Sequence, residues 1–248
     1  MHAVILAAGR GSRLGPRTDD RPKGLVEVAG RPMLDWQARA LRAGGMEEVT
    51  VITGYRGGDI AARGFATLEN PDWNRGNMVS SLARALAAIP GPLIVSYSDI
   101  LYSAATVRAL AARDAPLVLS HDPDWLTLWE RRFDDPLSDA ETFRLGARGQ
   151  VTEIGGRTTD ASAIQGQFMG LVKIGTEGRG WIEALLAAQP KARLELDTTS
   201  LLSTLISAGH PVTAIPVQGA WCEVDGPRDL AVAEALVAEG RLTPEGAP

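Results

Sequence analysis

Short apolar runs alternate with amphipathic stretches along the first half of the chain. Runs such as Val4 to Ala8 and Leu93 to Tyr97 predict buried strands. Between these runs, apolar positions recur every three or four residues, which predicts helices. The expected strands are 4–8, 49–53, 65–68, 93–97 and 117–120, and the expected helices are 32–43, 58–63, 77–89 and 106–113. Because strand and helix alternate, the sequence predicts an α/β fold with a parallel sheet and helices on both faces.

The alternation breaks at Asp122. The segment 122–140 is rich in Asp, Pro and Trp and has no clear period. Beyond it, the expected strands are 142–145, 151–154, 167–174 and 212–217, and the expected helices are 177–188, 198–208 and 226–239. Short strands around a turn indicate antiparallel pairing, so we expect an antiparallel insertion over about 122–175 within one domain, 1–248. The last few residues, which include Pro248, are expected to be loosely held.

The composition is that of an ordinary globular protein, with 45% hydrophobic and 22% charged residues. The net charge of −5 argues against a general nucleic-acid binder. No apolar run reaches the ~18 residues of a membrane span, and no signal peptide precedes the first strand. The single cysteine, Cys222, excludes an intrachain disulfide framework and suits a reducing cytosol. We therefore expect a cytoplasmic protein with small-molecule partners, and a homodimer stays open.

A glycine-rich loop with many cations follows the first apolar run. Its three glycines between residues 9 and 15 let the backbone bend tightly, and successive N–H groups in such a loop can hold phosphate oxygens. Residues 1–42 contain eight Lys/Arg and four Asp/Glu, a local charge of +4. A P-loop needs Ser or Thr after Lys23, where Gly24 stands, and a dinucleotide fingerprint needs glycine at Leu14. The loop predicts another kind of polyphosphate site; the alternative is a flexible basic surface loop.

The spacing of this loop resembles the signature of nucleotidyltransferases that join an NTP to a phosphorylated sugar or alcohol. It reads Gly9-x-Gly11-Ser12-Arg13-Leu14-x-Pro16-x-Thr18-x-x-x-Pro22-Lys23. The stretch 70–82 is similar to phosphocholine cytidylyltransferases, and 94–100, 125–129 and 135–142 are similar to cytidylyltransferases of small phosphorylated amino compounds and phosphonates. The resemblance implies a Rossmann-like, GT-A-like nucleotide-diphospho-sugar transferase fold. It also implies transfer of CMP from CTP to a small phosphorylated acceptor, with release of pyrophosphate.

Such a reaction needs charge neutralisation and alignment more than a general base, because the acceptor phosphate is already a nucleophile. The resemblance implies that Arg13 and the loop N–H groups hold the β- and γ-phosphates and that Lys23 neutralises the α-phosphate. These two residues are the expected catalytic groups. Asn77 and Ser81 are expected near the cytosine or ribose, although Asn77 is also a natural helix cap. The residues expected to bind the nucleotide are Ala7, Ala8, Gly9, Gly11, Ser12, Arg13, Lys23, Gly54, Asn77 and Ser81.

Two aspartates stand where ligands bind in a parallel sheet, beyond the carboxyl ends of strands. A magnesium ion that bridges phosphates usually takes one or two protein carboxylates, so Asp99 and Asp225 are the expected Mg²⁺ ligands. The alternative is that Asp99 caps a turn and Asp225 caps the last helix. Many relatives carry a second acidic residue two positions before Asp99, where this chain has Tyr97. This departure puts more weight on Asp225.

Several aromatic residues fall in predicted loops at the same edge of the sheet. Aromatic faces can hold a quaternary ammonium ion, with core packing as the alternative for each tryptophan. Asp139, Glu153 and Glu223 are carboxylates that could hold an amine instead. The residues expected to contact the acceptor are Tyr97, Trp125, Trp129, Glu141, Gln167 and Trp221.

Three alternatives from other classes stay open. The first is a sugar-1-phosphate nucleotidyltransferase that uses UTP, dTTP or GTP. The second is a glycosyltransferase, which usually shows an Asp-x-Asp metal motif; here Tyr97-Ser98-Asp99 lacks the first acid. The third is a non-catalytic nucleotide sensor, and the presence of Lys23 with Asp99 and Asp225 argues against it. Pyrophosphate release with CTP separates the cytidylyltransferase from the glycosyltransferase and the sensor.

Overall fold

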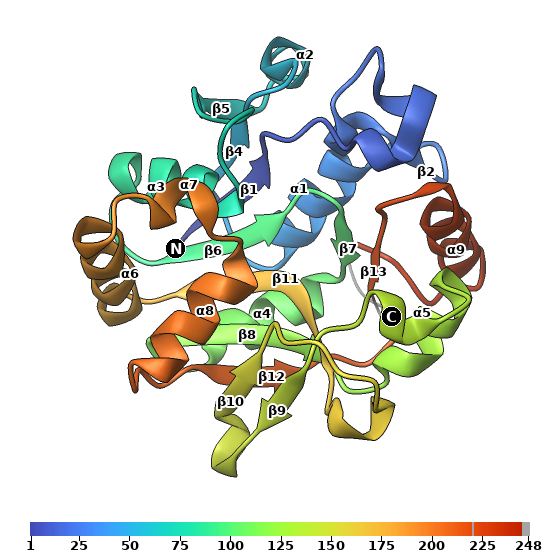
Figure 1. The fold of residues 1–248 in the computed structure, drawn as a ribbon. Coiled ribbons are helices and arrows are strands. Elements are labelled where there is room, and N and C mark those ends of the chain that lie inside the picture. The colour runs from blue at the N-terminus through green and yellow to red at the C-terminus, as the bar shows by residue number, and fades with distance from the viewer. Residues whose placement is uncertain (220, 245–248) are drawn as a thin grey trace.

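The computed structural model describes residues 1–219 and 221–244, which form helices packed on a seven-stranded sheet (Figure 1). The expectation for the last residues, including Pro248, lies outside this part of the chain. The strand order is β12-β8-β11-β6-β1-β4-β5. The strands of this sheet are β1 (His2–Ala7), β4 (Val49–Thr53), β5 (Ala66–Glu69), β6 (Leu93–Tyr97), β8 (Leu117–Asp122), β11 (Gln167–Ile174) and β12 (Thr213–Pro216).

Strand β1 lies in the middle of the parallel part and is buried on both faces. Ala3, Ile5 and Ala7 belong to one apolar core. Val4 and Leu6 belong to a second core on the opposite face. Side chains alternate between the faces of a strand, so a continuous apolar run is what a strand with two covered faces requires. This is why the opening run predicted a buried strand correctly.

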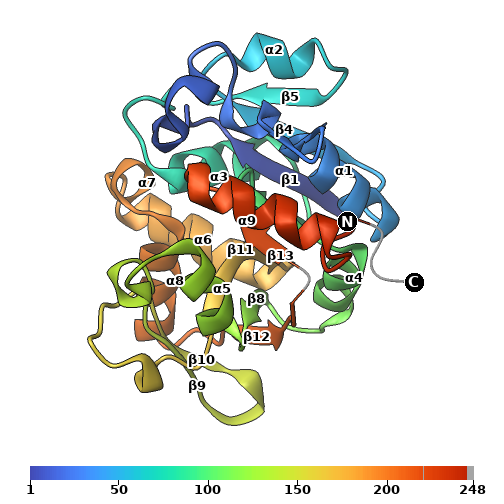
Figure 2. The same cartoon turned by 90° about the vertical axis from the view of Figure 1, so that its right-hand side faces the viewer.

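Helices cover both faces, as the alternation predicted. The α-helices are α1 (Met33–Ala43), α2 (Gly57–Ala61), α3 (Met78–Ala88), α4 (Ala104–Ala112), α5 (Trp125–Arg132), α6 (Thr176–Ala188), α7 (Ala192–Glu195), α8 (Thr198–Ser207) and α9 (Pro227–Ala238). Residues of α1 and α4 complete the first core, and residues of α3, α6 and α8 complete the second. Helices α5 and α9 pack against each other at one end of the sheet (Figure 2).

The antiparallel part is smaller than the expected insertion over 122–175. Strands β9 (Phe143–Leu145) and β10 (Val151–Ile154) form a separate antiparallel ribbon. Strand β11, in contrast, enters the main sheet between β6 and β8 and runs antiparallel to both. The fold is therefore the expected mostly parallel sheet flanked by helices, with one reversed strand inside it.

One helix and two short strand pairs were not expected from the sequence. Helix α5 occupies part of the segment 122–140 that showed no period. Strands β7 (Ile100–Tyr102) and β13 (Trp221–Glu223) pair with each other in an antiparallel ladder away from the main sheet. A further short pair joins β2 (Glu27–Val28) to β3 (Arg31–Pro32). Each of these strands has only two or three residues, too few for a periodic signal.

None of the helices in the described residues is long and apolar enough to cross a membrane.

Candidate active site

The glycine loop after β1 is a compact turn closed by its own side chains. A 3₁₀-helical segment, Ser12–Thr18, follows Gly11, whose φ of 75° lies in the left-handed region. The buried hydroxyl of Thr18 lies 3.2 Å from the carbonyl oxygens of both Gly11 and Gly15 and donates to them. Leu14 is fully buried and anchors the turn in the core. These contacts hold the loop in one shape over the end of β1, so it is not a flexible surface loop.

Gly11 is the point where the loop meets the stem of Lys23. A Cβ atom at Gly11 would lie 2.6 Å from Cβ of Lys23, far inside van der Waals contact. The glycine therefore serves a close approach as well as the left-handed turn. This contact explains physically why the motif pairs a glycine with a lysine twelve residues later.

The ammonium group of Lys23 bridges two carboxylates. Its Nζ lies 2.8 Å from Oδ2 of Asp99 and 2.5 Å from Oδ1 of Asp225. Arg13 Nη2 lies 2.8 Å from the same Asp225 oxygen. Burial would lower the pKa of Lys23, but the two carboxylates outweigh it and raise that pKa above its usual value. Lys23 is therefore charged, and it lies beside the two aspartates that the sequence proposed as metal ligands.

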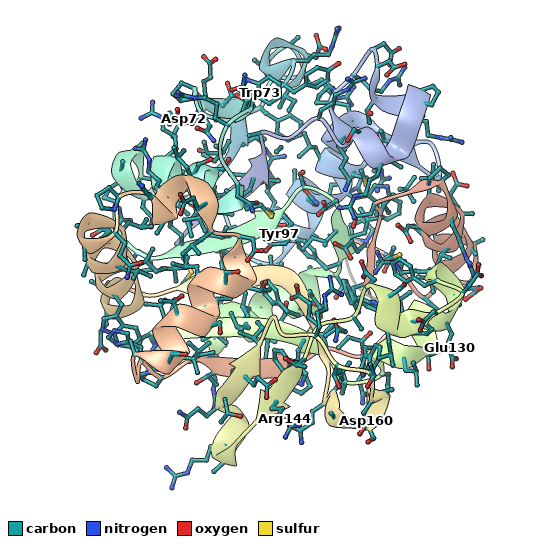
Figure 3. All side chains as sticks on the ribbon, in the orientation of Figure 1. Asp72, Trp73, Tyr97, Glu130, Arg144 and Asp160 are labelled. Atoms are coloured by element: carbon teal, nitrogen blue, oxygen red, sulfur yellow. The ribbon has the colours of Figure 1, made fainter. Side chains whose placement is uncertain are left out.

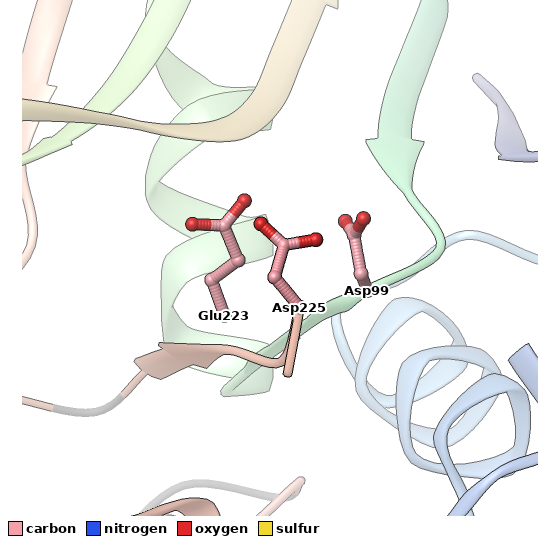
Figure 4. Close-up of side chains that lie close together, drawn as sticks. All are labelled: Asp99, Glu223 and Asp225. Carbon is pink, nitrogen blue, oxygen red and sulfur yellow. The ribbon is translucent and has the colours of Figure 1, made fainter. Parts of the chain in front are cut away.

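Glu223 completes a group of three carboxylates (Figure 4). One oxygen from each of Asp99, Glu223 and Asp225 lies within 4.8 Å of the others. The pairing of β7 with β13 brings them together, because the N–H of Val224 donates to the carbonyl of Asp99 at 2.8 Å. From the sequence, Glu223 is expected only as a carboxylate that could hold an amine. The Glu-x-Asp spacing of 223 and 225 was the signal that could have placed it here.

The three carboxylates have the donor chemistry of a divalent-cation site. Oδ1 of Asp99 is buried and has no hydrogen-bond partner among the described residues. Burial and the carboxylate of Asp225 raise the pKa of Glu223 to about 8. An unpartnered carboxylate oxygen and a strained cluster of like charges are what a hard cation stabilises. The residues therefore fit a magnesium ion, with Asp99, Glu223 and Asp225 as candidate ligands.

A buried glutamine holds the turn that carries Asp99. Gln37, on α1, is fully buried, and its Nε2 donates to the carbonyls of Tyr97 at 2.9 Å and Ile100 at 2.6 Å. These two carbonyls flank Asp99, so the turn between β6 and β7 cannot move without breaking a buried contact. In the sequence, Gln37 is one polar position within a predicted helix, and no local pattern predicts this role.

A pocket of about 240 Å³ opens between the glycine loop and the start of α3. Eight of the predicted site residues line it, namely Ala8, Gly9, Gly11, Arg13, Lys23, Asn77, Ser81 and Asp99. Ser98, Trp73, Gly76, Met78 and Ser80 also line it and were not predicted. Of the remaining nucleotide candidates, Ala7 is buried within β1 and Ser12 is exposed on the loop surface.

The far wall of the pocket is built on a buried asparagine. Asn70, 2% exposed, donates from Nδ2 to Oγ of Ser80 at 2.9 Å and of Ser81 at 3.0 Å. Asn77 caps α3, since its side chain accepts from the N–H of Met78 at 2.8 Å. The helix cap expected as an alternative role for Asn77 is therefore present, and Asn77 also lines the pocket.

Gly54 packs closely against Trp73, which lines the pocket. A Cβ atom at Gly54 would lie 2.4 Å from Cβ of Trp73 and 2.7 Å from the carbonyl oxygen of Ala8. The N–H of Tyr55 donates to that carbonyl at 2.9 Å. Gly54 thus lets the end of β4 and the Trp73 loop close around the end of β1. Trp73 lies toward β5, whereas Tyr97 lies near the centre of the molecule (Figure 3).

The three tryptophans expected at the acceptor form a buried cluster. Trp125, Trp129 and Trp221 are 3%, 3% and 2% exposed. Ring centroids lie 6.1 Å apart between Trp125 and Trp129 and 6.0 Å apart between Trp129 and Trp221. Each indole N–H donates to a neighbour: Trp129 to Asp139, Trp125 to the carbonyl of Ile164, and Trp221 to Asp122. In this structure the cluster is part of the apolar core, which is the core-packing alternative.

The remaining acceptor candidates lie around the start of β11. The ring of Tyr97 packs edge-on against Phe168 at 5.9 Å between centroids. Gln167 is buried and bonds both backbone groups of Glu141, accepting from its N–H at 3.1 Å and donating to its carbonyl at 2.6 Å. Burial and the nearby Asp197 raise the pKa of the Glu141 carboxyl above its usual value. Gln167 therefore positions Glu141 and has little remaining hydrogen-bonding capacity for a ligand.

Comparison with known proteins assigns the family. Residues 3–154 match the family model of the MobA-like NTP transferase domain. The chain is 32% identical over 251 residues to the CTP:phosphoglutamine cytidylyltransferase of Campylobacter jejuni. The alignment covers 94% of this chain and 98% of that protein.

Two solved structures share the fold across nearly the whole chain. The inositol-1-phosphate CTP transferase of T. maritima has a TM-score of 0.75 at 20% identity and covers 95% of this chain and 94% of its own. The CTP:phosphocholine cytidylyltransferase of Streptococcus pneumoniae has a TM-score of 0.74 at 18% identity, and the match covers 95% of this chain and 98% of that chain. With the family model spanning more than half of its length and a relative aligned nearly end to end, the chain belongs to the MobA-like NTP transferase family.

Proposed function

We propose that the protein transfers CMP from CTP to a small phosphorylated alcohol or amine, or to a phosphonate, and releases pyrophosphate. The observation that carries the proposal is the pocket between the glycine loop and α3, with Lys23 and three carboxylates at its end. The relative aligned over most of its length is named as a cytidylyltransferase of a phosphorylated amino acid. CTP is therefore the donor to test first.

The chemistry follows from the charges in the pocket. An oxygen of the acceptor phosphate attacks the α-phosphorus of CTP, the bond from that phosphorus to the β-phosphate oxygen breaks, and pyrophosphate leaves. Lys23 lines the pocket and supplies positive charge at the α-phosphate, and Arg13 with the loop N–H groups supplies it at the β- and γ-phosphates. Preorganised charges of this kind stabilise the transition state without reorganising during the reaction.

A magnesium ion on Asp99, Asp225 and Glu223 would neutralise charge that develops on the phosphates. The site suits Mg²⁺ because all three protein ligands are oxygen donors. Lys23 bridges Asp99 and Asp225 and also lines the pocket. We propose that the Lys23 ammonium pairs with the carboxylates when no divalent cation is bound. When a cation is bound to the carboxylates, the ammonium pairs with the phosphates instead.

The acceptor side is proposed to lie beyond the carboxylates, toward Tyr97 and Glu141. Tyr97 has Asp99, Glu223 and Asp197 among the charges that act on it, so this region is acidic and suits an acceptor that also carries an amine. We further propose a cytosolic enzyme with small-molecule partners, without nucleic acid or membrane, and 1–248 as one nucleotidyltransferase domain. The tryptophan cluster would then support this region from below, with no direct contact to the acceptor.

Pyrophosphate release tests the proposal directly. The purified chain is incubated with Mg²⁺, one NTP at a time, and phosphocholine, phosphoethanolamine, a phosphorylated amino acid, 2-aminoethylphosphonate or a hexose 1-phosphate. Release with CTP and a phosphorylated amino compound, abolished by a chelator, is the expected result. Release only with UTP, dTTP or GTP and a hexose 1-phosphate would make it a sugar nucleotidyltransferase. No release with any pair would contradict the proposed function.

A further inference from the structure

Arg132, near the end of α5, is a fully buried cation directly behind the three carboxylates. Its side chain is 0% exposed, and it lies between two acidic groups. Nη2 of Arg132 is 3.0 Å from Oε2 of Glu223, and Nε is 2.9 Å from Oδ1 of Asp229. Its guanidinium carbon lies 4.7 Å from the ring centroid of Trp129, a cation–π contact. Nothing in the proposed chemistry so far uses this residue.

Asp229, in the first turn of α9, carries the other half of the arrangement. Its Oδ2 accepts the backbone N–H of Asp225 at 2.9 Å and of Gly226 at 2.8 Å. One carboxylate of Asp229 therefore joins Arg132 to the backbone that presents Asp225. An acidic side chain that accepts N–H groups at the start of a helix also interacts favourably with the helix dipole.

The two contacts hold Glu223 and Asp225 side by side on one segment of the chain (Figure 4). Glu223 is held by its side chain through the ion pair, and Asp225 is held by its main chain through Asp229. Both carboxylates face Asp99 across the site. Like charges at this separation repel, and the guanidinium of Arg132 beside Glu223 adds to the ammonium of Lys23 in offsetting that repulsion.

A buried ion pair is a poor source of stability, because the cost of desolvating the charges offsets their attraction. An apolar residue on α5 would pack against Trp129 and Phe133 at least as well. The advantage of arginine at this position is its shape: Nε donates a hydrogen bond to Asp229 while Nη2 of the same planar group lies at ion-pair distance from Glu223.

We infer that Arg132, acting with Asp229, is a positioning residue that sets the spacing of Glu223 and Asp225 for the divalent cation. The inference rests on the metal site of the proposed function. Groups that orient metal ligands from outside the coordination sphere change metal affinity by about 10–100-fold when they are removed. Arg132 would therefore act on nucleotidyl transfer through the cation and not through the nucleotide.

Binding of Mn²⁺ to the full chain without nucleotide tests the inference, measured by loss of the free Mn²⁺ electron paramagnetic resonance signal. Arg132→Met should raise the Mn²⁺ dissociation constant about 10–100-fold, and Asp229→Asn should weaken binding in the same direction. Arg132→Lys, which keeps the charge, should restore part of it. The matched control is Arg131→Met, the preceding residue on α5, which pairs with Glu239 at the surface; it should bind Mn²⁺ like the wild type.

In turnover assays, Arg132→Met should need about 10–100-fold more Mg²⁺ for half-maximal rate, with KM for CTP little changed at saturating Mg²⁺. Wild-type Mn²⁺ affinity in folded Arg132→Met would overturn the inference. If circular dichroism shows that this variant does not fold, unchanged affinity in both Arg132→Lys and Asp229→Asn overturns it instead. Failure of CTP turnover would reject the proposed function alone, because Mn²⁺ binding is measured without it. A wild-type protein that binds no Mn²⁺ would reject the metal site and the role of Arg132 together.

Discussion

Lys23 can reach Asp99 and Asp225 only because the residue that faces its stem has no side chain. Gly11 combines a left-handed φ of 75° with a contact that leaves no room for a Cβ. The same lysine is 6% exposed, so its charge acts in surroundings that screen it weakly. At the scale of single residues, the site is thus a small number of charges held at fixed separations by tight packing.

A substitution at Gly11 should separate packing from backbone strain. Gly11→Ala adds a methyl group against the Lys23 stem, so we expect turnover to fall at least tenfold together with a loss of about 1–2 kcal/mol in stability. Gly30→Ala is the matched control, because Gly30 has a φ of 74° and nothing within 4 Å of an added Cβ. In urea unfolding the control should lose only the part of the stability that backbone strain accounts for, and it should keep its kcat. Equal turnover in both variants would contradict the role of Gly11.

Removal of the lysine charge should affect catalysis more than folding once a cation is present. Lys23→Ala leaves Asp99 and Asp225 without their shared ammonium, so without metal we expect a stability loss of about 3–5 kcal/mol. Mg²⁺ should restore most of that loss, while kcat stays about 10²–10³-fold below wild type. Lys191→Ala, at an exposed lysine, is the control. Equal losses of turnover and stability in Mg²⁺ would count against a catalytic Lys23.

At the scale of elements, short turns carry the chemistry and buried amides hold the turns. Gln37 reaches from α1 to both sides of the Asp99 turn, and Asn70 ties the Trp73 loop to the first turn of α3. Each uses one side-chain amide to satisfy two buried partners. Loops positioned in this way by rigid elements are where functional residues concentrate.

Loss of the Asn70 amide should therefore weaken nucleotide binding. Asn70→Ala leaves the hydroxyls of Ser80 and Ser81 without their donor, and we expect a stability loss of about 1–3 kcal/mol. Because Ser80 and Ser81 line the pocket, KM for CTP should rise more than kcat falls. Asn74→Ala, on the exposed part of the same loop, should change neither. A normal KM with lower kcat would instead place Asn70 in a role at the reacting phosphates.

At the scale of the whole molecule, two apolar cores on opposite faces of one sheet give the stability on which the site depends. The carboxyl ends of β1 and β6, and the turns that follow them, converge at one edge of the sheet, and β13 is added to that edge from the far end of the chain. The second core includes Phe143, on which the buried ring of His121 stacks at 5.1 Å.

The His121 ring should make stability depend on pH. Burial lowers its pKa below the ordinary value of 6.5. Below about pH 6.5 the unfolded chain therefore protonates this histidine while the folded chain keeps it neutral. The free energy of unfolding consequently falls as the pH drops, by up to about 1.4 kcal/mol per pH unit. The difference in unfolding free energy between wild type and His121→Gln, from urea titrations at pH 7.5 and 5.5, should shrink at the lower pH. A difference that does not change with pH would contradict a neutral buried His121.

Local patterns predicted most of the fold because they depend on neighbours in the chain. The five-residue segments 49–53 and 93–97 are strands β4 and β6 with the predicted bounds. The hydrophobic pattern did not predict helix α5 because one of its buried positions is Arg132, a charged residue where an apolar residue is expected. Its buried residues Trp125, Leu128, Trp129 and Arg132 do follow the helical spacing of three and four.

The sequence by itself determined the strands of the main sheet, most of the helices, and the glycine loop with Arg13 and Lys23, since these follow from periodicity and backbone freedom within a few residues. Only the tertiary structure decided that β11 reverses inside the main sheet and that β7 pairs with β13. It also decided that Glu223 joins Asp99 and Asp225 and that the tryptophans pack in the core. The physical reason is that pairing of distant strands and packing of distant side chains depend on the whole set of competing contacts, which no local spacing encodes.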